Sequence, residues 1–150
     1  MSVLNIKQVN LDTALKEEDI VILNKILNDI IAYPESYPFH EPVKYKEWGL
    51  TDYLQIISVP MDLSTISTKL KNSKYKKIIE VLDDIQLIWD NCKTYNADGS
   101  EIFIQTENVE KYADSLIRKY FKTEKSKFLL FKYSIGTNYN VSKIYANIFK

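Results

Sequence analysis

The sequence predicts an all-α protein built around a bundle of four amphipathic helices, and three observations support this fold class. Four segments repeat apolar residues at the three- and four-residue spacings of a single helical face. Residues that start or stop helices stand at the ends of these segments. The chain has 150 residues, 45% hydrophobic and 27% charged, which is the size and composition of one globular domain with a buried core.

The first two helices are each bounded by a local signal. In the first, one helical face is formed by Ile20, Leu23, Leu27, Ile30 and Ile31. This helix should end before Pro34, because a proline pushes the preceding residue out of the helical region. The second follows Asp62, whose carboxylate can accept hydrogen bonds from the free N–H groups of the first turn. Its apolar stripe consists of Leu63, Ile66 and Leu70.

The third and fourth helices are longer. The third has its apolar residues at Ile78, Leu82, Ile85, Trp89 and Cys92. The fourth starts after Ser100, whose hydroxyl can cap it, and its apolar residues are Ile102, Val109, Ala113, Leu116 and Tyr120. Glu101 near its start and Lys119 near its end carry the charges that a helix dipole favours. Four amphipathic helices of these lengths are expected to pack as a bundle.

The segment that joins the first two helices, residues 33–61, has neither helical nor strand periodicity. It holds all the prolines of the chain and many aromatic residues, namely Tyr33, Tyr37, Phe39, Tyr45, Trp48 and Tyr53. Connections longer than about 12–15 residues without regular structure are usually functional or disordered. Disorder is disfavoured because disordered segments are poor in aromatics. We therefore expect an ordered loop that packs its own aromatic residues and forms one wall of a functional site.

Residues 123–150 form a C-terminal extension whose structure the pattern leaves open. Residues 127–135 fit a short strand or another extended segment. Helical spacing returns with Val141, Ile144, Tyr145 and Ile148, and Asn140 can cap such a helix. A helix that packs onto the bundle is the favoured interpretation, and a docking helix for a partner is the alternative.

Charge and residue counts exclude several classes of function. The net charge is zero and Arg118 is the single arginine, so the sequence predicts no sequence-specific nucleic-acid binding. Cys92 and His40 are the only residues of their types, which excludes disulfides and cysteine-based zinc sites. A Ser-His-Asp or Cys-His arrangement would have to use His40. We expect no enzymatic activity, no metal and no cofactor.

Membrane association is not expected either. No stretch approaches the roughly 18 consecutive apolar residues of a membrane span. Residues 1–10 lack the basic-then-apolar layout of a secretory signal, which favours a reducing intracellular compartment.

Three motifs lie in a consistent order on this helical framework. They are YPFHEPV at residues 37–43, DYLQIISVPMDL at residues 52–63 and NCKTYNADGSEI at residues 91–102. Through them the chain resembles the bromodomain family over most of its length, residues 17–122. The resemblance implies a left-handed four-helix bundle with a pocket at one end, between the long first loop and the loop joining the third and fourth helices. Residues 1–16 are then a lead-in, and residues 123–150 an extension.

The resemblance also implies a site that binds acetylated lysine. Asn96 would donate a hydrogen bond from its side-chain amide to the acetyl carbonyl, and Tyr53 would hold that carbonyl through a bridging water. Three groups of residues and a gatekeeper would shape the slot. Tyr37, Pro38 and Phe39 would form a shelf, Val43, Leu50 and Trp48 the walls, Cys92 and Tyr95 the floor, and Ile102 the gatekeeper. Burying the charge of unmodified lysine there would cost several kcal/mol, on the order of the penalty for an unpaired buried ion.

Asn96 on its own has a simpler interpretation, as a helix C-cap or turn residue beside Asp98 and Gly99. The surrounding motifs favour the anchor instead. Two positions depart from the family pattern, since Tyr37 stands where tryptophan is common and Trp48 where a smaller aliphatic residue is frequent. These departures bear on ligand preference and leave the anchor in place.

The favoured function is therefore a nuclear reader of acetylated lysine on histone tails or other acetylated nuclear proteins, acting in chromatin and transcription regulation. The alternative is a structural subunit that docks into a larger chromatin complex with a non-functional pocket. A third interpretation is a module from an enzyme such as an acetyltransferase, with the catalytic domain elsewhere.

Overall fold

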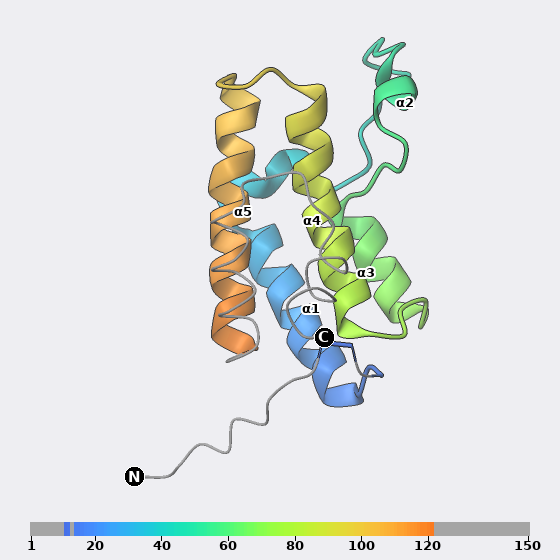
Figure 1. The fold of residues 1–150 in the computed structure, drawn as a ribbon, viewed down its shortest axis with the longest axis vertical. Coiled ribbons are helices and arrows are strands. Elements are labelled where there is room, and N and C mark those ends of the chain that lie inside the picture. The colour runs from blue at the N-terminus through green and yellow to red at the C-terminus, as the bar shows by residue number, and fades with distance from the viewer. Residues whose placement is uncertain (1–10, 13, 122–150) are drawn as a thin grey trace.

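The protein is an all-α bundle in its computed structural model, which describes residues 11–12 and 14–121 (Figure 1). Four principal helices build the bundle over this part of the chain, and two short helical segments lie in the connection between the first two of them. In chain order the elements are α1 (Glu17–Ala32), η1 (Pro34–Phe39), α2 (Tyr53–Ile56), α3 (Leu63–Lys71), α4 (Ile78–Tyr95) and α5 (Glu101–Tyr120). The four predicted helices are thus present. The extended segment and helix predicted within residues 123–150 lie outside the described residues.

The helix ends follow the predicted capping signals. Asp62 accepts a hydrogen bond from Thr65 N at 3.0 Å at the start of α3. At the start of α5, the Ser100 hydroxyl accepts one from Phe103 N at 3.4 Å. α1 ends at Ala32, two residues before Pro34, as the restriction on residues preceding proline requires.

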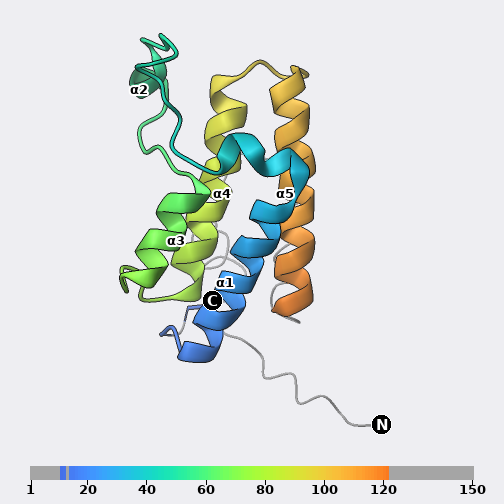
Figure 2. The same ribbon diagram turned by 180° about the vertical axis from the view of Figure 1, so that it is seen from behind.

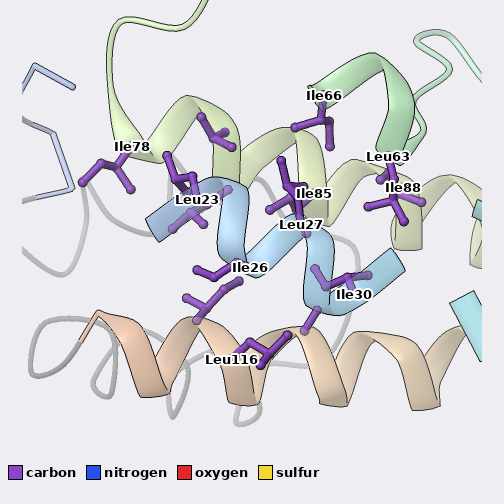
Figure 3. Close-up of a cluster of buried hydrophobic side chains, with 14 of the residues drawn as sticks. Leu23, Ile26, Leu27, Ile30, Leu63, Ile66, Ile78, Ile85, Ile88 and Leu116 are labelled. Carbon is purple, nitrogen blue, oxygen red and sulfur yellow. The ribbon is translucent and has the colours of Figure 1, made fainter. Parts of the chain in front are cut away.

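The core fills the space between all four principal helices (Figure 3). Figure 3 shows α1 at the centre of this core, between α5 on one side and α3 and α4 on the other. Its buried side chains include Leu23, Ile26, Leu27, Ile30, Leu63, Ile66, Ile78, Ile85, Ile88 and Leu116. Each such side chain contributes roughly 1.5–3 kcal/mol on burial. The bundle is therefore a stiff frame for the loops at its ends.

Residues 33–61 are ordered, as predicted, but they contain more regular structure than expected. The first part is η1, a 3₁₀ helix with Pro34 at its start, and a later part is the single turn α2. Periodicity does not detect either, because a 3₁₀ helix repeats every three residues and α2 spans one turn. α5 holds η1 in place, since Gln105 Nε2 donates to Glu35 O at 2.8 Å.

The second half of this loop projects from the bundle near the end where α4 and α5 are joined (Figures 1 and 2). Two side chains of α4 hold it there. Asn91 Nδ2 donates to Val59 O at 2.8 Å, and Tyr95 Oη donates to Asp52 Oδ1 at 2.7 Å. The loop and the α4–α5 connection therefore face one another at the same end of the bundle.

The N-terminal part of the described chain also belongs to the packed unit. Leu11 is 0% exposed within the core, and its carbonyl accepts a hydrogen bond from Ile79 N at 3.0 Å. Leu15 N donates to Lys76 O at 2.8 Å. The predicted boundary at residue 17 lies where α1 begins, and we propose that the domain also includes Leu11 and Leu15. None of the helices in the described residues is long and apolar enough to span a bilayer.

Candidate functional site

A pocket of about 350 Å³ opens between the long loop and the facing ends of α4 and α5. This is the size of a small-molecule or side-chain site. Its lining comes from residues 38–61 on one side and from α4 and the start of α5 on the other. The lining residues are Pro38, Phe39, Glu41, Val43, Trp48, Leu50, Tyr53, Met61, Ile88, Asn91, Cys92, Tyr95, Asn96 and Ile102.

All but one of the predicted site residues line this pocket. The exception is Tyr37, which is 78% exposed on the outer face of η1. Residues three apart share a face of a 3₁₀ helix, and here Ser36 and Phe39 occupy the buried face. Tyr37 is turned away from that face. Its ring centroid lies 5.9 Å from that of His40, and the two rings pack edge to face. Phe39 packs edge-on against Trp89 of the core at 5.2 Å, which ties the shelf to the bundle.

The pocket also contains residues that the sequence did not single out, namely Glu41, Met61, Ile88 and Asn91. Ile88 and Asn91 could have been predicted to line the pocket. They lie one helical turn before Cys92 and Tyr95 and therefore share the same face of α4. Met61 lies inside the second motif, and Glu41 inside the first.

Asn96 is the C-cap residue of α4, which confirms that it ends this helix. Its backbone is extended at φ −100° and ψ 149°, a conformation that most residue types adopt. The backbone shape therefore does not require asparagine. The side chain is held from one side, since Nδ2 donates to Cys92 O at 2.9 Å and lies 3.4 Å from Cys92 Sγ.

Tyr53 is a buried residue of the pocket, only 5% exposed. Its ring stacks on Tyr45 at 5.6 Å and meets the edge of Tyr95 at 5.0 Å. Burial is the main cause that raises the pKa of Tyr53, so its hydroxyl is protonated at neutral pH and can donate. Among the described residues, this hydroxyl has no hydrogen-bond partner. For Tyr95, the hydrogen bond to Asp52 raises the pKa.

Cys92 provides a small, uncharged part of the floor. Burial raises the pKa of its thiol, which therefore stays protonated. Thr106 Oγ1 lies 3.1 Å from Cys92 Sγ and 2.7 Å from Ile102 O, joining α4 to the start of α5 at the pocket. His40, the single histidine of the chain, does not line the pocket, so it is not placed to act as a base for the thiol. This arrangement suits a packed floor and not a nucleophile.

A buried polar cluster joins α4 to α5. Lys93 Nζ lies 2.5 Å from Glu110 Oε1, and the two side chains are 3% and 7% exposed. Gln86 Nε2 donates to Glu110 Oε2 at 2.8 Å. These charges are paired with one another and do not line the pocket. They link α4 to α5, the two helices that border the pocket.

The pocket is therefore an apolar slot with a few polar groups at defined positions. Its apolar walls suit a hydrocarbon chain and a methyl group, while the Asn96 amide and the Tyr53 hydroxyl suit a single acceptor. The lining carboxylate, Glu41, is exposed to solvent. No group of three or more metal-ligating side chains occurs in residues 11–12 and 14–121.

Comparison with protein families gives a match to the bromodomain model over residues 23–108, more than half of the chain. Among solved structures, the second bromodomain of Candida albicans Bdf1, bound to an imidazopyridine, superimposes with a TM-score of 0.65 at 25% identity. That alignment covers 68% of this chain and 99% of the Bdf1 domain. The predicted fold class, a left-handed four-helix bundle, is confirmed by this match.

Curated relatives match over a similar part of the chain. Histone acetyltransferase GCN5 of Debaryomyces hansenii is 39% identical over 93 residues, which are 62% of this chain and 20% of that protein. Transcription factor GTE1 of Arabidopsis thaliana is 33% identical over 59% of this chain and 23% of its own length. The bromodomain adjacent to zinc finger domain protein 2B of Gallus gallus is 34% identical over 70% of this chain and 5% of its own length. The chain thus spans less than a quarter of each of these relatives.

Proposed function

The chain belongs to the bromodomain family, and we propose that its pocket binds an acetylated lysine side chain anchored by Asn96. The observation that carries this proposal is the way in which Cys92 orients the Asn96 amide. A carbonyl oxygen can only accept, so the amide nitrogen must face Cys92 O, where it lies at 2.9 Å. Among the described residues, the second N–H of the amide has the weak acceptor Cys92 Sγ nearby, at 3.4 Å. An acetyl carbonyl is a much better acceptor for it.

Tyr53 supplies the second polar contact. Its hydroxyl is buried and protonated, and it has no hydrogen-bond partner among the described residues. We assign to it a water that bridges the hydroxyl and the acetyl carbonyl, which satisfies the hydroxyl when the ligand is bound.

Selectivity for the acetylated form follows from charge. The pocket presents apolar walls and neutral polar groups to the end of the lysine side chain, and Glu41 stays at the solvent-exposed margin. An unmodified ammonium would lose its hydration without gaining a buried carboxylate, at a cost of several kcal/mol, on the order of the penalty for an unpaired buried ion. Acetylation removes that charge and adds the acceptor that Asn96 needs.

The ligands we propose are acetylated histone tails or other acetylated nuclear proteins, and the site of action is the nucleus. This rests on relatives named as a histone acetyltransferase and a transcription factor. The bromodomain fold is a binding module, so the protein should alter affinity and assembly without turning over its ligand. A single side chain buries far less than a standard protein interface, so further contacts in a larger chromatin complex would add to the affinity.

The test compares two asparagine variants by calorimetric titration with an acetylated histone-tail peptide. Asn96→Ala should weaken binding roughly 10- to 100-fold, because the acetyl carbonyl loses its donor. Asn28→Ala, on an exposed position of α1, is the matched control and should bind like the wild type. Equal affinity of both variants, with both folded, would refute the anchor. Failure of the wild type to bind any acetylated peptide would favour the docking-subunit alternative.

A further inference from the structure

A second hollow of about 310 Å³ lies beside the pocket. We call it the side hollow. It shares Pro38, Glu41 and Trp48 with the pocket, so these residues form a common wall between the two. Its remaining lining residues are Tyr37, His40, Pro42 and Lys44. A peptide whose acetylated lysine enters the pocket would place a neighbouring side chain against the side hollow.

Two large aromatic rings are exposed at this hollow. Tyr37 is 78% exposed and Trp48 is 60% exposed. Their backbone is well defined, because Tyr37 lies on the 3₁₀ turn and Trp48 N donates to Lys44 O at 3.0 Å. His40 is fixed beside Tyr37 by a 2.9 Å contact between its Nε2 and Ser36 Oγ. Exposed aromatics that gather at one place commonly mark a binding surface.

The chemistry of the hollow suits a cation. The faces of tryptophan and tyrosine attract an ammonium or guanidinium group, and tryptophan does so most strongly. Glu41 adds a solvent-exposed carboxylate on the common wall. Lys44 has the opposite charge, but its exposed side chain is long and can direct its ammonium into solvent.

We propose that the side hollow binds a positively charged lysine or arginine side chain that lies close to the acetylated lysine in the same peptide. This inference rests on the proposed function of the pocket. It adds a specificity determinant, because the protein then recognises acetyl-lysine in a basic context. Acetylation of the neighbouring lysine removes the charge, and with it the attraction to Trp48 and Glu41.

The experiment measures binding of matched peptides with one central acetyl-lysine. Within about four residues of it, the reach of a short extended segment, each position carries in turn lysine, acetyl-lysine, methionine or glutamate. At one or more positions, lysine should bind about 3- to 10-fold tighter than acetyl-lysine or methionine, and the preference should decrease as salt is added. The quantity compared is the Kd of the methionine peptide divided by the Kd of the lysine peptide at the same position. A general change in affinity cancels in this ratio.

Three variants locate the preference. Glu41→Gln and Tyr37→Ala should bring the methionine-to-lysine Kd ratio close to one, whereas Lys44→Gln should increase it. A wild-type ratio of one at every position, or a preference for methionine or glutamate, overturns the proposal. An unchanged ratio in Glu41→Gln and Tyr37→Ala overturns it as well. Acetyl-dependent binding without charge preference refutes the side hollow alone, and absence of all acetyl-dependent binding refutes the pocket and the hollow together.

Discussion

Replacing Lys93 with methionine tests how much the buried polar cluster between α4 and α5 contributes to stability. The change keeps the length of the side chain but removes the ammonium 2.5 Å from Glu110. Because both side chains are almost fully buried, Glu110 would have to keep its charge without this partner or take up a proton. Breaking a buried pair from one side costs about 3–5 kcal/mol. Lys93→Met should therefore destabilise the domain by about this amount.

Urea unfolding followed by far-UV circular dichroism gives the free energy of unfolding. The double variant Lys93→Met with Glu110→Leu should recover most of the loss, because apolar residues of similar size can replace a buried pair. Lys25→Met is a matched control, since Lys25 pairs with Asp29 at 2.9 Å on an exposed face of α1. The reasoning is refuted if Lys93→Met is as stable as the control, or if the double variant is no more stable than Lys93→Met.

Three further predictions address the pocket and the packed unit. Tyr53→Phe should weaken acetyl-peptide binding by roughly 2- to 10-fold, because it deletes the hydroxyl proposed to hold the bridging water. Calorimetric titration checks this, and an unchanged affinity would contradict it. Leu11→Ala should lower the free energy of unfolding by about 2–5 kcal/mol in urea unfolding, because it leaves a cavity in the core. A change near zero would mean that Leu11 does not belong to the packed domain. Burial raises the pKa of the Cys92 thiol, so at a given alkaline pH the folded protein holds less thiolate than the unfolded chain. Iodoacetamide should then alkylate the folded protein more slowly, and acetylated peptide should slow it further; equal rates would count against burial of the thiol.

The helices could be predicted because their signals are local. The apolar repeat of each helix lies within its own segment, and the caps at Asp62 and Ser100 act on backbone N–H groups three residues away. The short elements of the long loop could not be predicted in this way. η1 and α2 are too short to show a repeat, and contacts from Gln105 and Asn91 hold this loop in place. Those contacts depend on the tertiary fold.

The acetyl-lysine site stays a prediction, but the structure shows how many of its residues lie around one pocket. The motifs led to the residues that surround the pocket, and Asn96 lies at its predicted place. Tyr37 does not line the pocket as the other shelf residues do. The three-residue repeat of η1 directs Ser36 and Phe39 inward and Tyr37 outward. A motif gives the order of residues but not the helix type that they adopt. Trp48 had been assigned to a wall, and it also forms the wall of a second hollow.

The role of Asn96 can be observed at its own side chain. In a nitrogen-15 NMR titration, the two N–H signals of the Asn96 side-chain amide can be assigned by comparison with Asn96→Ala. The acetylated peptide should shift one of them strongly, because that N–H exchanges the weak contact with Cys92 Sγ for a hydrogen bond to a carbonyl. The unmodified peptide should leave both in place. If the acetylated peptide binds while both Asn96 signals stay unchanged, the acetyl group is not anchored there and the account is wrong.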